Sequence, residues 1–462
     1  MSQHFVKDTK PIICSVIDFK PDFVWGVSTS ALQTEGAFDI DGKESSIWDA
    51  FATKKNVIFN NDSPSVACDF YHRFEEDINI IKQLGIPNFR FSLSWPRILP
   101  KGTGIINQAG IDFYHRVIDH CLKSGIEPWI TIYHWDLPLE LEKNGGWTNR
   151  EILHWFEEFV QVCITSFGSK VKNWMILNEP IVFTGAGYFV GMHAPGKKGI
   201  SNFLAALHHA NLCQGIGLRT IKQHYPNARV GTTFSCSHIT SFTEREKDKL
   251  ASNRIHTLLN RLAIEPLLGL GYPINDLPTL GNIKKWIKQG DETAIKAEFD
   301  FIGIQVYTRE VVTHSMFIPY LKAKLVPAAK RKVYHTKMGW EIYPKALQNM
   351  IEHFAAYEAV KEIFITENGA SFADEVTDGI VDDQQRIDYL KTYIEKLCKI
   401  VSETPKVKGY FVWSLTDNFE WNEGYNQRFG LVYIDFASQQ RIIKNSGFWY
   451  SNFIKNHPVP IV

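Results

Sequence analysis

Two glutamates stand at places where the surrounding sequence favours apolar residues. Glu367 follows the apolar run 363–365, and Glu179 follows the run 174–177. Runs of this kind are typical of parallel strands that are covered on both faces, and a single acid at the end of such a strand is usually one that has just reached solvent. Two carboxylates at neighbouring strand ends can instead act together in acid–base or nucleophilic chemistry.

The segments that must position these glutamates alternate between strand-like and helix-like patterns. We expect Asn107 to cap a helix that stops at Gly125, a capping box at 148–151 to open a helix over 151–168, and a third helix over 387–401. The candidate strands are residues 23–28, 88–94, 128–134, 172–178, 228–235, 299–307, 362–368 and 409–415.

Eight strand-then-helix units without repeats predict an α/β protein, a single-domain (β/α)₈ TIM barrel with long βα-loop insertions. An open doubly wound sheet is the alternative. We expect residues 1–462 to form one catalytic barrel, with about residues 1–18 as an N-terminal lead-in.

Polar and aromatic residues recur where these candidate strands end. In a barrel the carboxyl ends of all strands lie on one rim, where active sites are built. One polar strand end is unremarkable, but seven of eight ending this way predict a shared site. At or just beyond these ends lie Gln33, Arg90, His134, Trp135, Asn178, Glu179, Gln305, Tyr307, Glu367 and Trp413.

Composition narrows the class of partner. The 462 residues are 44% apolar and 22% charged, as in an ordinary globular protein, and their formal net charge is zero. A neutral chain argues against nucleic acid or an anionic membrane as the main partner. The 13 Trp, 17 Tyr and 31 Phe suit a core, and they also suit ligands with flat apolar faces, such as sugars.

Cysteine usage and the absence of a recognisable targeting segment favour a cytoplasmic location. The seven cysteines are scattered, contain no C-x-x-C and are odd in number, which favours reduced thiols. Neither a secretory leader nor an apolar run long enough to cross a bilayer is recognisable. The sequence carries no signal for oligomeric state.

Several kinds of chemistry lack their usual signatures in this chain. There is no H-x-x-x-H motif or Cys/His cluster, so we expect no metal, and no lysine ends a strand to form a Schiff base. The segment GAGYFVG at 185–191 misses the dinucleotide-binding spacing by one residue, so we expect no cofactor. What remains is a pair of carboxylates among amides and tryptophans, the equipment of glycoside hydrolysis.

The chain resembles the retaining β-glycosidases of glycoside hydrolase family 1, the β-glucosidase family, over essentially its full length. The matching segments, in order, are FVWGVSTSALQTEG, YHRFEEDI, NFRFSLSWPRILP, YHWDLP, GGWTN, NEP, GYFVGMHAPG, MGWEIYP, ITENG and WSLTDNFEWNEGYNQRFGL. This resemblance implies the same (β/α)₈ barrel, no cofactor and a small-molecule β-glycoside as substrate.

The resemblance also implies roles for individual residues. Glu179 in NEP matches the acid/base, and Glu367 in ITENG matches the nucleophile that forms a glycosyl-enzyme ester. Arg90 and Tyr307 match groups that keep the nucleophile ionised, and Asn178 matches the residue that bonds the sugar 2-hydroxyl. The residues that match the substrate-binding set are Gln33, His134, Trp135, Asn178, Gln305, Trp340, Trp413, Glu420, Trp421 and Phe429.

Three other functions are weighed against this one. A 6-phospho-β-glycosidase shares the fold, but Glu420 would repel a phosphate dianion. A non-catalytic sugar-binding protein would lack one of the two glutamates. A transglycosylase stays open, because it differs only in whether water or a sugar intercepts the ester.

Two departures from the family pattern lie close to the expected site. Gln305 stands where the family usually has Asn, and its longer amide is expected to point into the barrel mouth near Tyr307. Ile181 follows NEP where Trp is common, which alters the leaving-group side. The choice between glucose, galactose and fucose rests on single hydroxyl groups and is not settled by these motifs.

Overall fold

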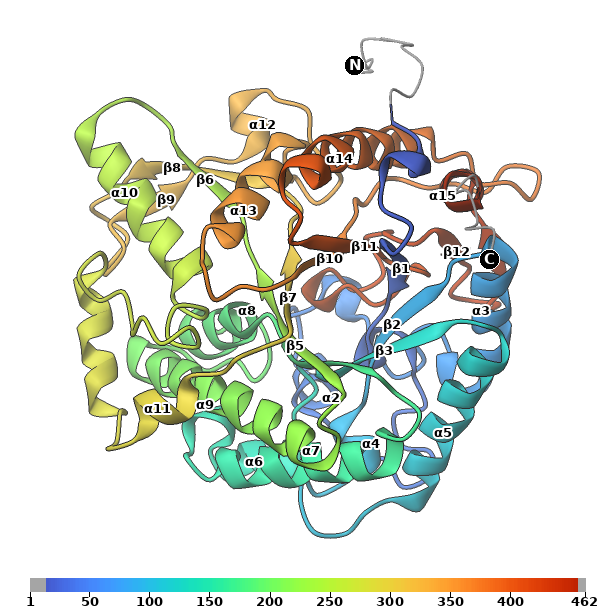
Figure 1. Cartoon of the computed structure of the whole chain (residues 1–462), viewed down its shortest axis with the longest axis horizontal. Coiled ribbons are helices and arrows are strands. Elements are labelled where there is room, and N and C mark those ends of the chain that lie inside the picture. Colours follow the sequence, from blue (N-terminus) through green and yellow to red (C-terminus); the bar gives the residue numbers. More distant parts are fainter. Residues whose placement is uncertain (1–13, 456–462) are drawn as a thin grey trace.

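A computed structural model describes residues 14–455 and contains a closed barrel of parallel strands in the order β1-β11-β10-β7-β5-β4-β3-β2 (Figure 1). β1 pairs with both β2 and β11, which closes the ring. The barrel fold is therefore confirmed, and the open sheet is wrong. The barrel strands are β1 Val24–Ser28, β2 Asn88–Ser92, β3 Glu127–Tyr133, β4 Asn173–Asn178, β5 Arg229–Ser235, β7 Phe301–Gln305, β10 Ile363–Asn368 and β11 Val407–Trp413.

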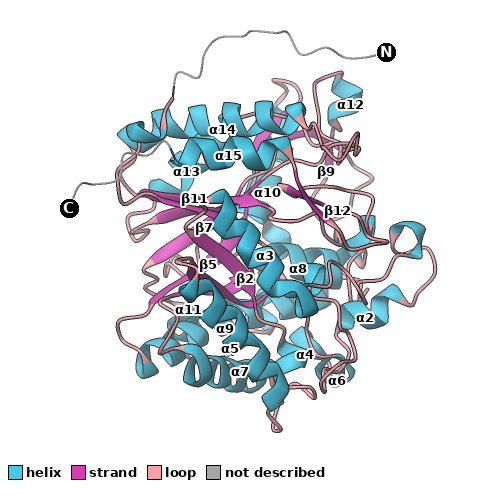
Figure 2. Ribbon diagram, turned by 90° about the vertical axis from the view of Figure 1, so that its right-hand side faces the viewer, coloured by secondary structure: helices cyan, strands magenta, loops and turns pink. Residues whose placement is uncertain are grey.

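Helices surround this ring and cover the outer faces of the strands (Figures 1 and 2). α14 shows why they lie there: Leu390, Ile394 and Leu397 recur at helical spacing and are buried, as the pattern over 387–401 predicts. The long helices are α3 Phe70–Leu84, α5 Gln108–Lys123, α7 Ile152–Phe167, α9 Ile200–His224, α10 Glu246–His256, α13 Lys345–Ala355, α14 Gln384–Glu403 and α15 Asn445–Lys455. None of the helices described between residues 14 and 455 is both long and apolar enough to cross a membrane.

Two predicted helix starts differ in detail from the structure. Asn107 does precede α5, but its side chain donates to the carbonyls of Asp41 and Arg97 and does not cap the helix. The predicted capping box at 148–151 is wrong. The Thr148 hydroxyl donates back to Gly145, because the chain makes a 3₁₀ turn at Gly146–Thr148 before α7 begins at Ile152.

Shorter elements fill the connections and account for the length beyond a minimal barrel. The short helices are α1 Ala31–Thr34, α2 Ile47–Ala52, α4 Trp95–Ile98, α6 Leu139–Lys143, α8 Pro180–Gly185, α11 Asp291–Ile295 and α12 Ala328–Arg331. The additional strands are β6 His238–Ser241, β8 Arg309–His314, β9 Ala323–Leu325, β12 Val432–Ile434 and β13 Arg441–Ile443. The 3₁₀ and π turns are η1 Val16–Asp18, η2 Phe59–Asn61, η3 Gly146–Thr148, η4 Ala186–Val190, η5 Thr257–Arg261, η6 Pro278–Lys285 and η7 Trp421–Glu423.

A layer of large side chains fills the barrel interior beneath the site. Its rings pack closely, with the centroids of Trp129 and Phe364 5.0 Å apart. The layer consists of Trp129, Met175, Phe301, Phe364 and Phe411. Arg90 lies against this layer, because its Nε is 3.1 Å from the Met175 sulfur. The barrel interior is thus filled by side chains at this level.

The end of β10 is fixed by hydrogen bonds on both sides. Asn368 donates to the Val306 carbonyl at 2.6 Å and accepts from the Tyr410 hydroxyl at 2.7 Å. The next residue, Gly369, packs so closely that an added Cβ would lie 1.8 Å from the Trp413 carbonyl oxygen. The position of Glu367 therefore depends on a glycine two residues later.

We predict that Gly369→Ala lowers the free energy of unfolding by about 1–3 kcal/mol, because the added methyl group overpacks a backbone contact. Gly281→Ala is the matched control, since a Cβ there would meet nothing within 4 Å. Denaturant unfolding of both variants measures the difference. Equal stability of the two variants would show that the close approach at Gly369 is not a constraint.

Candidate active site

The carboxyl ends of the barrel strands surround a cavity of about 330 Å³. Every residue of the predicted site lines it except Arg90, Asn178 and Gln305, which lie behind its wall. The predicted residues on the wall are Gln33, His134, Trp135, Glu179, Tyr307, Trp340, Glu367, Trp413, Glu420, Trp421 and Phe429. Predicted side chains from six strand ends, from the segment before α13 and from the loop after β11 therefore meet in one place.

Glu367 is held by three donors. Arg90 Nη1 lies 2.6 Å from its Oε1, Gln305 Nε2 lies 2.7 Å from the same oxygen, and the Tyr307 hydroxyl lies 2.7 Å from Oε2. The Arg90 and Glu367 side chains, which form an ion pair, are both buried, so solvent screens the attraction between their charges only weakly. Burial raises the pKa of Glu367, while the Arg90 charge and the Tyr307 hydroxyl oppose that rise.

Glu179 lies in a different environment. It follows β4 with a left-handed backbone (φ 48°), and no cation pairs with its carboxyl group among the described residues. Burial and the nearby charge of Glu367 raise its pKa to about 8, against a hydrogen bond from Ser235. The carboxyl of Glu179 is therefore protonated at neutral pH. Of the two carboxyl groups, we place the proton on Glu179 rather than on Glu367.

Left-handed backbone at residues other than glycine recurs around the cavity. Trp135 has φ 77° and Trp421 has φ 49°, in addition to Glu179. Such conformations cost free energy for residues with a Cβ and often occur at functional sites. Here they turn three side chains that follow strands or loops toward one cavity.

Asn178 and His134 form the layer next to the carboxylates. Asn178 Oδ1 accepts from Arg90 at 2.5 Å and from the Thr233 hydroxyl at 2.9 Å, and its amide nitrogen lies 3.0 Å from His134 Nε2. Burial lowers the pKa of His134, so its ring is neutral and Nε2 accepts. His134 Nδ1 is then the protonated nitrogen, and it has no protein partner. Among residues 14–455 this nitrogen is a buried donor without an acceptor.

Another part of the cavity wall combines amide, carboxyl and indole groups. Gln33 Nε2 donates to the Phe419 carbonyl at 3.0 Å and lies 3.4 Å from Glu420 Oε2. Burial and the charge of Glu367 raise the pKa of Glu420 to about 8. The ring of Trp413 is stacked with His134 at 6.0 Å. This wall offers both an apolar face and hydroxyl-binding groups, as a sugar ring requires.

The Gln305 amide lies between the strands of the two glutamates, as the sequence predicts, but it is behind the cavity wall. It is fully buried and does not line the cavity. Its Nε2 lies 2.7 Å from Asn178 Oδ1 and 2.7 Å from Glu367 Oε1, so it joins these two residues. The Gln305 side chain is one methylene longer than the usual Asn, and it reaches the acceptors on Asn178 and Glu367 from behind the cavity wall. We infer that Gln305 acts by positioning Asn178 and Glu367; its predicted contact with substrate stays a prediction.

Sequence reasoning missed about half of the cavity wall. Ser235 had a usable signal, because it ends its strand as the predicted residues do. Glu310 carried none: it lies in β8, an additional strand, and burial raises its pKa to about 7. The missed residues are Val182, Met192, His193, Ser235, Cys236, Ser237, Thr308, Glu310, Met338, Asn422 and Glu423.

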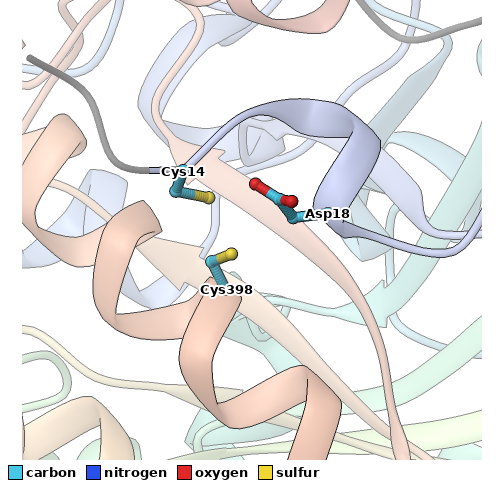
Figure 3. A group of neighbouring side chains, drawn as sticks. All are labelled: Cys14, Asp18 and Cys398. Atoms are coloured by element: carbon cyan, nitrogen blue, oxygen red, sulfur yellow. The ribbon is translucent and has the colours of Figure 1, made fainter.

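A possible metal-binding group lies outside the barrel. Cys14, Asp18 and Cys398 are the one set of three such side chains among residues 14–455 whose ligand atoms lie within 4.8 Å of one another. Figure 3 shows both thiols and the carboxylate turned toward one another where η1 meets α14. All seven cysteines are free, as expected for reduced thiols. That the reaction needs no metal stays a prediction.

Comparison with known proteins agrees with this geometry. The sequence profile of Glycosyl hydrolase family 1 matches residues 16–459. The chain belongs to glycosyl hydrolase family 1. The family and the glycoside hydrolase class predicted from the motifs are therefore confirmed.

Individual family 1 relatives cover almost the whole chain. Beta-glucosidase A of Thermotoga maritima is 42% identical over 445 residues, 96% of this chain and 99% of the relative. A bifunctional beta-D-glucosidase/beta-D-fucosidase of Bifidobacterium breve is 35% identical over 95% of this chain and 98% of its own. The solved Thermotoga maritima beta-glucosidase in complex with glucoimidazole has a TM-score of 0.90, with 42% identity, over 95% of this chain and 99% of that one.

We predict that Gln305→Leu lowers kcat/KM by about one to two decades, because the buried acceptors on Asn178 and Glu367 lose a donor at a cost of about 1–3 kcal/mol. Loss of a donor to Glu367 should also move the acid limb of the pH–rate profile to higher pH. Gln305→Asn keeps an amide and should be milder. The measurement is the pH dependence of kcat/KM, with folding checked by thermal unfolding. A folded Leu variant with the parent's rate and profile would contradict this role.

Proposed function

We propose that this family 1 glycoside hydrolase is a retaining β-glucosidase in which Glu179 is the acid/base and Glu367 is the nucleophile. The observation that carries the proposal is the contrast between the two carboxyl groups. Glu367 is paired with Arg90, while Glu179 has no cation and a pKa raised to about 8. An ionised nucleophile beside a protonated acid is what the first step of a retaining mechanism requires.

In the first step, Glu367 attacks the anomeric carbon as the bond to the leaving oxygen breaks. Glu179 gives its proton to that oxygen, and a glycosyl ester of Glu367 remains. Glu179, now ionised, then takes a proton from water, whose oxygen displaces Glu367 from the anomeric carbon. The two inversions together retain the β-configuration.

We assign the non-reducing glucosyl ring to the wall formed by Gln33, His134, Trp413, Glu420 and Trp421. These side chains supply donors, acceptors and an apolar face within one cavity. β-Galactosyl and β-fucosyl groups are further candidates, because each differs from glucosyl by very few hydroxyl contacts. The Bifidobacterium breve relative is named for both glucosidase and fucosidase activity.

A phosphorylated sugar fits this cavity poorly. No lysine or arginine lines it, within the part of the chain that the structure describes. Burial lowers the pKa of both lining histidines, His134 and His193, which keeps them neutral. A phosphate dianion would thus be desolvated without a cation.

We further propose that residues 1–462 act as one catalytic unit and that the protein works in the cytoplasm. The barrel strands run from Val24 to Trp413 and close with each other, which supports a single unit. Seven free cysteines support a reducing compartment.

Azide rescue of two variants tests the assignment of roles. Glu179→Ala should remain active on 2,4-dinitrophenyl β-glucoside, whose leaving group needs no proton, and added azide should intercept its ester to give β-glucosyl azide. Glu367→Ala should form no ester and yield α-glucosyl azide, because azide enters from the vacated face. Glu244→Ala, at an exposed glutamate, is the control and should match the parent.

The products are identified by NMR. β-Glucosyl azide from Glu367→Ala, or α-glucosyl azide from Glu179→Ala, would show that the two roles are reversed. Equal loss of activity in both variants for every leaving group would contradict the division of labour altogether. Parallel assays of the parent on aryl β-galactoside, β-fucoside and 6-phospho-β-glucoside rank the sugars, and a product assay with an added acceptor sugar measures transfer.

A further inference from the structure

A second cavity of about 390 Å³ adjoins the catalytic one. We call it the side chamber. Its walls carry apolar side chains almost throughout, and no charged residue lines it within residues 14–455. The two cavities share five lining residues, namely Val182, Met192, Ser235, Cys236 and Ser237. The side chamber is therefore a continuation of the catalytic cavity.

The junction lies beside the acid/base. The Ser235 side chain hydrogen-bonds to the carboxyl group of Glu179 and lines both cavities. α8 begins at the residue after Glu179, and its residues Ile181 and Gly185 form part of the chamber wall. The oxygen that Glu179 protonates thus lies near the chamber entrance, so the chamber is on the leaving-group side.

The remaining walls come from the barrel helix α9 and from elements outside the minimal barrel. Phe189 and Phe203 stack with their centroids 5.4 Å apart, and Leu258 lies on η5. At the outer rim, Val190 is 54% exposed and Leu325 is 44% exposed. The chamber therefore has an apolar floor and an apolar opening to solvent, which suits a long ligand better than a compact one.

We propose that the side chamber binds the aliphatic chain of the leaving group, so that the preferred substrates are β-glucosides of extended aliphatic alcohols. The proposal rests on the β-glucosidase function above. A second sugar in the chamber would lose water from its hydroxyl groups and find few partners beyond Ser235 and Ser237. An aliphatic chain has no hydroxyl groups to desolvate, and each methylene that it buries adds favourable binding free energy.

The test is a series of n-alkyl β-D-glucosides from ethyl to octyl, assayed below micelle-forming concentrations. Their leaving groups are almost equally acidic, so differences in kcat/KM report contacts with the chain. Burial of each methylene is worth about 0.8 kcal/mol, so kcat/KM should rise about three- to fourfold per methylene.

Gly185→Leu should flatten this dependence, because the new side chain occupies the chamber. Gly185 has a helical backbone (φ −70°) that other residues adopt, and a Cβ there would meet nothing within 4 Å. Gly281→Leu, at a glycine that is equally open but lines neither cavity, should keep the parent's slope. Leu325→Asn is a second variant, which places a polar group at the partly exposed rim of the chamber without filling it.

The outcomes separate this proposal from the function on which it rests. The enzyme could hydrolyse 2,4-dinitrophenyl β-glucoside and yet show no dependence of kcat/KM on the chain length of the alkyl glucosides. That result would overturn the side-chamber proposal alone. An unchanged slope in both Gly185→Leu and Leu325→Asn would also overturn it. Failure to hydrolyse any β-glucoside would overturn the β-glucosidase assignment and the side chamber with it. The proposal is supported if kcat/KM of the parent rises steeply with chain length, if Gly185→Leu flattens this rise and if Gly281→Leu keeps it.

Discussion

The buried contact between the Arg90 guanidinium and the Glu367 carboxylate is the interaction on which the rest of the site depends. Their side chains are 0% and 5% exposed, so both charges have lost almost all of their water. Buried ion pairs are often no more stabilising than apolar residues of the same size, and they persist only when every remaining donor and acceptor is satisfied. We infer that this pair serves the chemistry more than the stability of the fold.

The pair also explains why a closed barrel is needed. Arg90 lies on β2 and Glu367 on β10, which are not neighbours in the ring, so the guanidinium crosses the interior to reach the carboxylate. The same guanidinium bonds Asn178 on β4, and Gln305 on β7 joins Asn178 to Glu367. Four strands thus fix one carboxylate. Glu179 lies nearby without a cation, and burial together with the negative charge of Glu367 keeps its proton in place.

Features carried by short stretches of chain could be predicted from the sequence. The apolar runs before Glu179 and Glu367 indicated buried strands, and strand ends in a barrel share a rim, so the two glutamates followed; together with the family motifs, this reasoning gave about half of the cavity wall. Local hydrogen bonding was harder to foresee. The Thr148 hydroxyl donates to the Gly145 carbonyl in a 3₁₀ turn instead of capping α7. The sequence alone is compatible with either hydrogen bond.

Features that depend on long-range packing were not predictable in this way. The bond between Gln305 and Glu367 follows from how β7 and β10 are aligned, with Gln305 opposite Glu367. The side chamber is a stronger case. Ile181, Leu258 and Leu325 lie on separate insertions, and nothing in their spacing indicates that they face one cavity. Only the folded chain brings them to the leaving-group side of Glu179.

The central claim is that Arg90 and Glu367 together leave the proton of the site on Glu179. ¹³C NMR of enzyme labelled at the glutamate side chains, titrated against pH and assigned with Glu179→Gln and Glu367→Gln, tests it most directly. The account predicts that Glu179 titrates at a pKa of about 8 and that Glu367 titrates at lower pH. In Glu367→Gln the pKa of Glu179 should fall, because the neighbouring negative charge is gone. A higher pKa for Glu367 than for Glu179, or no change in Glu179 when Glu367 is neutralised, would contradict the account.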